Sequence, residues 1–184
     1  MHLQPVVNRW ADSMSNVLNE VLGLNAKPII RDGSLEQLVI DSWLESYPDA
    51  DIAVTNKGGV RADLESGEVT FSSVFNILPF DNNIIVVEVN GSAIMNALPE
   101  GGRPVLAGLK KSGEEWVLTR INEKLHPEKN YILLLNSFMY AGGDNFGAIA
   151  RANPNGFDTG MNYRQPFVNW IRRQDSTQNN PLHY

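Results

Sequence analysis

The sequence contains no cysteine, few histidines and no excess of positive charge. Without cysteine the chain has no disulfides, zinc–thiolate sites or thiol nucleophiles, and its redox compartment stays undecided. Lys and Arg number 15 against 21 Asp and Glu, a formal net charge of -6, so the basic surface of a duplex-binding protein is missing. We therefore expect no polymeric nucleic acid partner. A mononucleotide remains possible, because a few well-placed arginines can hold one phosphate whatever the net charge.

The three histidines are His2, His126 and His183. Two lie near the termini and the third precedes Pro127 in a predicted turn, so a His-rich dinuclear metal site cannot be assembled. No nucleophile-elbow pattern and no Ser/His/acid arrangement is present. We therefore expect neither a catalytic nor a metal-binding residue in this chain.

The opening segment carries neither a signal-peptide apolar region nor a membrane-spanning helix. On this basis the protein is either cytoplasmic or has had a leader removed. Apolar residues recur at three- and four-residue steps from Val6 to Val21 and predict a helix ending near Gly23. We interpret residues 1–26 as an N-terminal helix that serves as a linker or docking element.

Helices and strands follow one another without a strict βαβ alternation. A second helix is expected from Ser34, where Ser34 and Gln37 form a capping-box pattern, and another is capped by Ser92. The pattern indicates an α+β or mixed α/β domain over residues 27–173, followed by a polar tail over 174–184 that we expect to fray. Strands are predicted at 52–55, 69–71, 84–89, around 105, 116–121 and 131–136, and further helices at 72–76, 92–98 and 163–171.

Three loops present residues suited to grip a flat, anionic ligand. The first, residues 56–61 (NKGGVR), offers an amide, two glycines that permit close backbone approach and an arginine that can fork onto phosphate. The second places Phe80 before a polar run, and the third places Phe146 after residues 142–145 (GGDN). Taken alone, the first loop favours a tight turn bearing an exposed arginine, and Phe80 alone favours a core position. Together the two aromatics suggest a clamp on both faces of a base, since stacking contributes roughly 1–3 kcal/mol per base.

These loops, together with residues 74–82 (VFNILPFDN), resemble the C-terminal domain of bacterial and animal 5′-nucleotidases. The resemblance extends from Arg31, ahead of the second helix, to the Asp158-Thr159-Gly160 turn, and covers roughly residues 27–173. It implies a layered α/β/β/α sandwich that binds the nucleoside, with Phe80 and Phe146 around the base and Arg31 and Arg61 facing the phosphate. The residues expected to contact the substrate are Arg31, Asn56, Gly58, Gly59, Arg61, Phe80, Gly143, Asp144 and Phe146.

In this family the chemistry resides in a separate metallophosphoesterase domain, where two divalent metal ions clamp the phosphate and activate water. The resemblance therefore implies a split or truncated 5′-nucleotidase in nucleotide catabolism. Its nucleotide-recognition domain would be paired with a metallophosphoesterase domain or subunit and would hold no cofactor of its own. It also implies a periplasmic or cell-surface location.

A competing hypothesis is a stand-alone ligand-binding or protein-interaction module with no hydrolytic role. Lys57 stands where the family usually has another glycine, and residues 147–152 lack the acid that the family tends to place near the ribose. Both departures favour a site that has taken on a role different from nucleoside recognition.

Overall fold

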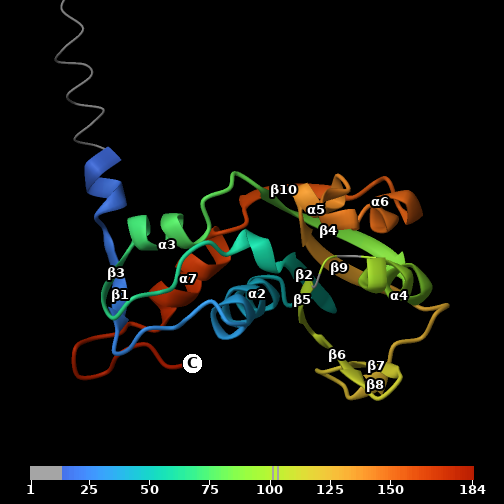
Figure 1. The fold of residues 1–184 in the computed structure, drawn as a ribbon, viewed down its shortest axis with the longest axis horizontal. Coiled ribbons are helices and arrows are strands. Elements are labelled where there is room, and N and C mark those ends of the chain that lie inside the picture. The colour runs from blue at the N-terminus through green and yellow to red at the C-terminus, as the bar shows by residue number, and fades with distance from the viewer. Residues whose placement is uncertain (1–13, 101, 103) are drawn as a thin grey trace, which may run out of the picture.

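The computed structural model describes residues 14–100, 102 and 104–184. Its centre is a five-stranded sheet in the order β10-β4-β9-β2-β5, in which β2 and β9 run parallel and every other pair is antiparallel (Figure 1). The strands are β2 (Ile52–Asn56), β4 (Asn83–Asn90), β5 (Pro104–Ala107), β9 (Asn130–Asn136) and β10 (Phe157–Asn162).

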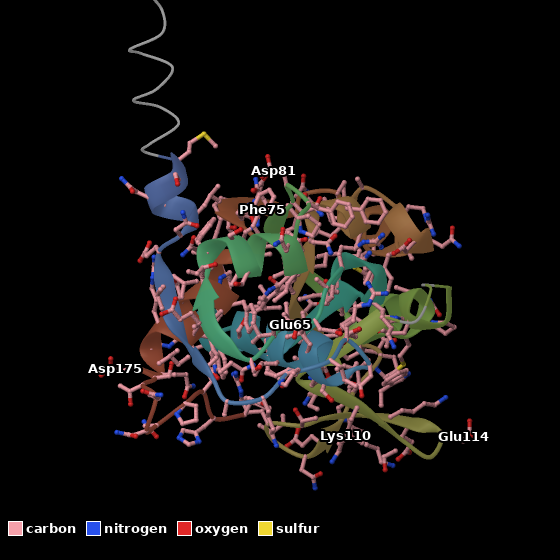
Figure 2. The ribbon with its side chains drawn as sticks, turned by 60° about the vertical axis from the view of Figure 1, so that its left-hand side comes forward. Glu65, Phe75, Asp81, Lys110, Glu114 and Asp175 are labelled. Atoms are coloured by element: carbon pink, nitrogen blue, oxygen red, sulfur yellow. The ribbon has the colours of Figure 1, made fainter. Side chains whose placement is uncertain are left out.

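Two smaller sheets flank the central one. β1 (Val21–Asn25) pairs with β3 (Gly67–Thr70), while β6 (Leu109–Ser112), β7 (Glu115–Leu118) and β8 (Glu123–Lys124) form a three-stranded sheet. Figure 2 shows this second sheet, with Lys110 and Glu114, at the opposite end of the view from Phe75 and Asp81.

Helices cover both faces of the central sheet. α2 packs on α7 and on β2 and β5, whereas α4 packs on α6 and β4. The helices are α2 (Ser34–Ser46), α3 (Phe71–Ile77), α4 (Gly91–Glu100), α5 (Ser137–Tyr140), α6 (Ala148–Ala152) and α7 (Gln165–Arg173), with 3₁₀ turns η1 (Lys57–Gly59) and η2 (Gly143–Asn145).

The alternation of side chains along the strands divides the interior into two cores. On β4, Ile84 faces the core shared with α2 and α7, whereas Ile85 and Val87 face the core shared with α4. Successive side chains of a strand point to opposite faces, so a strand that is apolar throughout must be covered on both sides. The mixed α/β class predicted from the sequence is confirmed.

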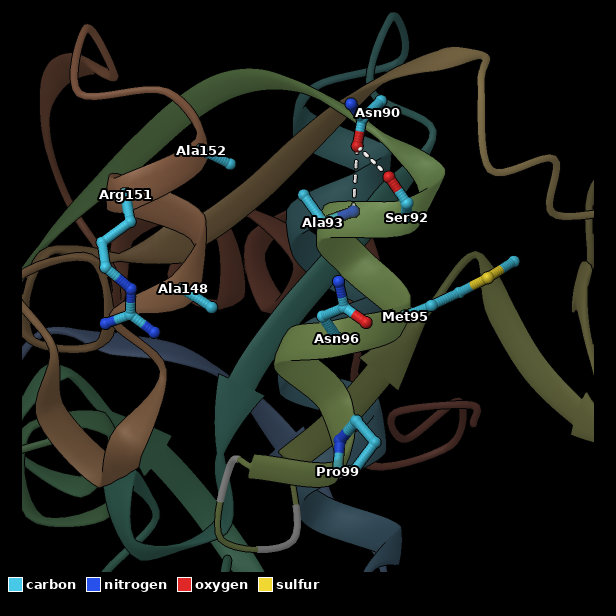
Figure 3. A pocket seen from close by; sticks show the side chains of 9 residues that line it. All are labelled: Asn90, Ser92, Ala93, Met95, Asn96, Pro99, Ala148, Arg151 and Ala152. Atoms are coloured by element: carbon cyan, nitrogen blue, oxygen red, sulfur yellow. Dashed lines mark hydrogen bonds between the residues drawn. The ribbon is translucent and has the colours of Figure 1, made fainter.

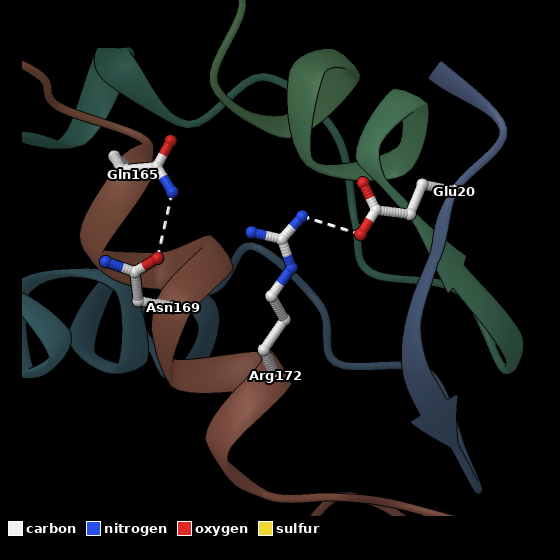
Figure 4. Close-up of polar contacts among 4 residues, drawn as sticks. All are labelled: Glu20, Gln165, Asn169 and Arg172. Atoms are coloured by element: carbon white, nitrogen blue, oxygen red, sulfur yellow. Dashed lines mark hydrogen bonds and ion pairs between the residues drawn. The ribbon is translucent and has the colours of Figure 1, made fainter. Parts of the chain in front are cut away.

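The N-terminal prediction is partly wrong. Residues 1–13 lie outside the described residues, and residues 14–18 are helical. From Val21, however, the chain forms β1 rather than a continuation of the helix, and its backbone pairs with β3. Arg172 of α7 meets Glu20 just before β1, with 2.7 Å between Nη2 and Oε1, while Gln165 and Asn169 bond within α7 (Figure 4).

Both predicted helix caps shift by one or two residues. Gly33, not Ser34, precedes the first turn of α2, and Glu36 Oε2 accepts a hydrogen bond from the Gly33 amide at 3.0 Å. At α4 the side chain of Asn90, not Ser92, accepts the Ala93 amide at 2.9 Å. Both helices nevertheless begin where the sequence places them, within the usual uncertainty of helix ends.

The C-terminal tail does not fray. Leu182 is buried in the core beside α7, and its amide donates to the Leu24 carbonyl at 2.8 Å. Ser176 Oγ accepts the Leu24 amide at 2.8 Å. The tail therefore lies against β1 and belongs to the packed domain.

Candidate functional site

The loops predicted to bind ligand meet at one edge of the central sheet. The parallel strands β2 and β9 end there with Asn56 and Asn136, and antiparallel β4 begins there with Asn83. Crevices outside the carboxyl ends of strands are common binding positions in α/β sheets. A cavity of about 450 Å³ lies at this edge and is lined by Asn56, Gly58, Arg61, Phe80, Asp81, Asn82, Phe138 and Asp144.

An amide network fixes the strand ends below the cavity. Asn136 is fully buried, and its Nδ2 donates to Asn56 Oδ1 at 3.0 Å and to Thr55 Oγ1 at 3.3 Å. Its Oδ1 accepts the Met139 amide at 2.8 Å and so caps α5. Because buried polar groups need partners, this network sets the orientation of the Asn56 side chain in the cavity wall.

The first loop supplies Arg61 and is held from behind by Arg31. Arg31 Nη1 donates to the carbonyl oxygens of Val60 and Arg61 at 3.3 and 3.0 Å, and Arg31 is not among the lining residues. Gly59 is likewise behind the wall, where an added Cβ would lie 3.2 Å from Asn56 Oδ1. Of the two arginines predicted to face the phosphate, Arg61 therefore lines the cavity and Arg31 does not.

Phe80 forms one aromatic wall of the cavity. Its side chain is 44% exposed, and the Arg61 guanidinium carbon lies 5.9 Å from the centre of its ring. A cation at this distance over a ring is attracted by the ring's quadrupole. The ring and the arginine thus stand next to each other at the cavity.

Phe138 forms the second aromatic wall, a position the sequence analysis missed. It lies on α5 and is 45% exposed. A Cβ at Gly143 would come within 2.4 Å of its ring, so the glycine lets the Phe138 ring lie against the loop backbone. The loop turns through Gly142, with φ of 101°, and Asp144, with φ of 52°. The signal available in the sequence was an aromatic directly after a strand end.

Phe146 does not line the cavity, which corrects the expected Phe80 and Phe146 pair. Its side chain is 1% exposed and packs in the core with Met139 and Ile149. The reason is local: α5 and η2 turn the chain so that Phe146 faces the sheet under α6, while Phe138 faces solvent.

Two residues just before α7, Tyr163 and Arg164, hold the Phe80 loop, and the sequence had placed Tyr163 only in the pattern of the last helix. The Tyr163 hydroxyl accepts the Phe80 amide at 3.3 Å and donates to the Gly59 carbonyl at 3.5 Å. Arg164 donates to the carbonyls of Leu78 at 3.0 Å and Phe80 at 2.7 Å. Burial raises the pKa of the Tyr163 hydroxyl to about 12. The hydrogen bond with Phe80 and the nearby Arg164 charge act in the opposite direction and lower this pKa.

A second polar layer joins the Phe80 loop to β10. Asn162 Nδ2 donates to Asp81 Oδ1 at 2.8 Å, and Asn83 Nδ2 donates to Asp158 Oδ2 at 3.1 Å. The Gly160 amide and the Asn83 side chain lower the pKa of the Asp158 carboxyl below its usual value. Asp158 is therefore held as a carboxylate that fixes the turn beside the site.

A larger cavity of about 630 Å³ lies elsewhere, between α4 and α6, and includes Asn90, Asn96 and Arg151 (Figure 3). It contains none of the residues predicted from the sequence. Its lining offers neither an aromatic ring nor a pair of charged groups converging on one point. The smaller cavity at the sheet edge therefore has the better chemistry for a flat, charged ligand.

Within the described part of the chain, no group of three or more His, Asp or Glu side chains is arranged to hold a metal ion. Over the same residues, no helix combines the length and apolar character needed to cross a lipid bilayer.

The structure thus defines a mixed α/β domain with a loop-lined cavity at one edge of its central sheet. The chain belongs to the family described as "5′-nucleotidase, C-terminal domain", which matches residues 24–116, about half of the sequence.

Curated relatives extend the likeness over most of the chain. It is 25% identical to the trifunctional nucleotide phosphoesterase protein YfkN of Bacillus subtilis, over 91% of this chain and 14% of that protein. It is 29% identical to the silent protein UshA(0) of Salmonella typhimurium, over 72% of this chain and 25% of that protein. The chain thus spans a quarter or less of the length of these relatives.

Solved structures share the fold. The 5′-nucleotidase precursor from Thermus thermophilus superposes with a TM-score of 0.78 at 21% identity, over 95% of this chain and 41% of that one. The NAD nucleotidase of Haemophilus influenzae superposes with a TM-score of 0.76 at 19% identity, over 94% of this chain and 39% of that one. At these identities the likeness establishes the fold.

Proposed function

We propose that this chain supplies the nucleoside-recognition site for a 5′-nucleotidase-type phosphoesterase. The observation that carries the proposal is the cavity of about 450 Å³ at the sheet edge, whose lining combines two exposed rings, Phe80 and Phe138, with Arg61. A base stacks on these rings, and stacking on an aromatic contributes roughly 1–3 kcal/mol per base. Membership in the family favours this role over a stand-alone module.

The polar groups around the rings each contact a different part of the ligand. Asn56 and Asn82 can both donate to and accept from base edges, while the Asp144 carboxylate accepts from hydroxyl or amino groups. Arg61 is the cation in the lining, and it faces the phosphate of a nucleotide. In this arrangement Asp144 takes over contacts with ribose hydroxyls that no acid in residues 147–152 can make.

Hydrolysis belongs to a metallophosphoesterase domain or subunit that acts together with this chain in nucleotide catabolism. Two divalent metal ions in that partner hold the phosphate and activate water. This chain's residues contribute binding and orientation, because none of its cavity-lining groups forms a nucleophile and base pair.

The site of action is outside the cytoplasm, in the periplasm or at the cell surface. The support comes from relatives. The cell wall protein Lmo0130 of Listeria monocytogenes is 26% identical over 88% of this chain and 25% of its own length. Fractionation of cells that express the full gene, with an antibody to this domain, tests the location; a purely cytoplasmic signal contradicts it.

Calorimetry with adenosine and AMP tests the recognition site. Phe80→Ala and Phe138→Ala should each weaken adenosine binding by about 1–3 kcal/mol, roughly 5- to 150-fold. Phe157→Ala is the matched control, because this ring is 68% exposed on β10 and does not line the cavity. Unchanged affinity in both wall variants, or an equal loss in the control, contradicts the proposed site.

Arg61→Met separates phosphate recognition from base recognition. AMP should lose about 1.5–3 kcal/mol of binding, the usual contribution of a hydrogen bond to a charged group, while adenosine affinity stays nearly constant.

Mixing the chain with a candidate dimetal phosphoesterase and measuring phosphate release tests the partnership. Nucleoside binding without any gain in activity or specificity with such partners would favour the stand-alone module.

A further inference from the structure

We propose that Arg164 and Tyr163 are positioning residues that fix the Phe80 ring in the wall of the cavity, an inference that rests on the proposed recognition site. Phe80 lies in the stretch between α3 and β4, which contains no helix or strand. The regular backbone hydrogen bonds of a helix or strand therefore do not hold it. The two positioning residues approach it from a point more than eighty residues further along the chain.

The Phe80 backbone is bonded on both sides of its Cα. Its amide donates to the Tyr163 hydroxyl at 3.3 Å, and its carbonyl accepts from Arg164 Nη2 at 2.7 Å. With both peptide groups held, the direction of the Cα–Cβ bond is set, and so is the side from which the ring enters the cavity.

Arg164 also joins the Phe80 stretch to α3. Its Nε donates to the Leu78 carbonyl at 3.0 Å, and its guanidinium carbon lies 4.8 Å from the centre of the Phe75 ring. A guanidinium is planar and presents donors in a fixed fork, so one side chain can hold two carbonyls at a set spacing. A lysine at this position cannot reproduce that fork.

Tyr163 joins the Phe80 stretch to the first loop. Its hydroxyl donates to the Gly59 carbonyl at 3.5 Å while it accepts from Phe80, so one oxygen touches two of the loops at the cavity. The ring of Tyr163 is buried and meets Trp43 edge-on at 6.4 Å, which anchors the hydroxyl in the core. The hydroxyl therefore sets the separation between the Arg61 side and the Phe80 side of the site.

Two variants test the proposal on the full chain. Arg164→Met and Tyr163→Phe should each weaken adenosine binding about tenfold, the equivalent of one net hydrogen bond. Arg164→Lys should bind adenosine as weakly as Arg164→Met does. In Arg164→Met the ratio of AMP to adenosine affinity should stay constant, because the Arg61 loop is untouched; a change in that ratio would mean that Arg164 contacts the phosphate itself and would overturn the positioning role.

Matched controls come from the other end of the fold. Arg120 also donates to two backbone carbonyls, those of Pro48 at 2.8 Å and Ala50 at 3.5 Å, and the Tyr131 hydroxyl accepts the His126 amide at 2.9 Å. Arg120→Met and Tyr131→Phe remove comparable bonds away from the cavity. If they reduce adenosine affinity as much as the test variants do, the effect is general loosening of the fold and the proposal fails.

A double-mutant cycle links the effect to the ring. In a Phe80→Ala background, Arg164→Met should have no further effect on adenosine affinity, since both of its backbone hydrogen bonds go to the Phe80 stretch. Additive losses would overturn the proposal.

Amide hydrogen exchange gives a readout that needs no ligand: Tyr163→Phe should speed exchange at the Phe80 amide. If wild type fails to bind adenosine, the proposed function fails, and unchanged exchange at this amide would separately overturn the positioning role.

Discussion

The two aromatic walls of the cavity are held in different ways. Phe138 lies on a short helix that is capped by Asn136 and seated against Gly143, so neighbours within a few residues fix it. Phe80 lies between elements, and residues 163 and 164 hold its backbone from across the fold. The difference teaches that one wall follows from local backbone geometry, whereas the other exists only once the whole domain has folded.

The largest effect is expected beneath the Phe138 wall. Phe146→Ala removes a ring that is 1% exposed in the core under α5 and α6, and it should lower the free energy of unfolding by about 3–5 kcal/mol. Urea unfolding measures the change. Phe138→Ala, by contrast, should stay within about 0.5 kcal/mol of wild type, as is usual for surface substitutions. A Phe146→Ala variant of normal stability and reduced adenosine affinity would restore Phe146 as a wall of the site.

A smaller effect should distinguish the two glycines of the same loop. Gly142 has φ of 101°, so Gly142→Ala should cost about 1–2 kcal/mol of stability through backbone strain. Gly143→Ala should leave stability nearly unchanged, because the exposed Phe138 ring can swing away from the new methyl group. Displacing that ring should instead weaken adenosine binding by about 1–3 kcal/mol. Equal stability losses in the two variants would show that Phe138 is held more firmly than its exposure suggests.

The smallest effect concerns the Phe80 wall and depends on pH. The pKa of Tyr163 is raised from 10.0 to about 12, so the unfolded state loses this proton first as pH rises. The stabilising contribution is therefore complete below pH 10 and declines as pH increases toward the folded value. Relative to Tyr163→Phe, wild type should lose about 1 kcal/mol of unfolding free energy between pH 10 and 11. A constant difference over this interval would contradict the buried, hydrogen-bonded hydroxyl.

The elements with the clearest local sequence patterns could be predicted from the sequence. The apolar, β-branched run of β4 and the capped start of α2 are signals that act over a few residues, and both elements appear where they were predicted. β1 was predicted as helix because its apolar spacing continued the preceding stripe. Its pairing with β3, more than forty residues away, decided the outcome.

The candidate site was predicted in outline. The loop positions, Asn56, Arg61 and Phe80 come together at one cavity, because strand ends and glycine turns are visible in the sequence. Which of two phenylalanines near the Gly-Gly turn faces solvent was not visible, since a one-turn helix has no periodicity to read. The roles of Tyr163 and Arg164 were hidden as well, because a hydrogen bond across the fold leaves no pattern in neighbouring residues.

The returning tail has a consequence for solubility. A two-stranded ribbon such as β1 with β3 normally exposes a row of unpaired backbone groups that another chain can capture. Here the amide and carbonyl of Leu24 that point away from β3 are taken by Ser176 and Leu182. The segment from Ser176 to Leu182 therefore covers this edge of β1, and shortening the chain before Ser176 would expose the Leu24 backbone groups to pairing with another chain.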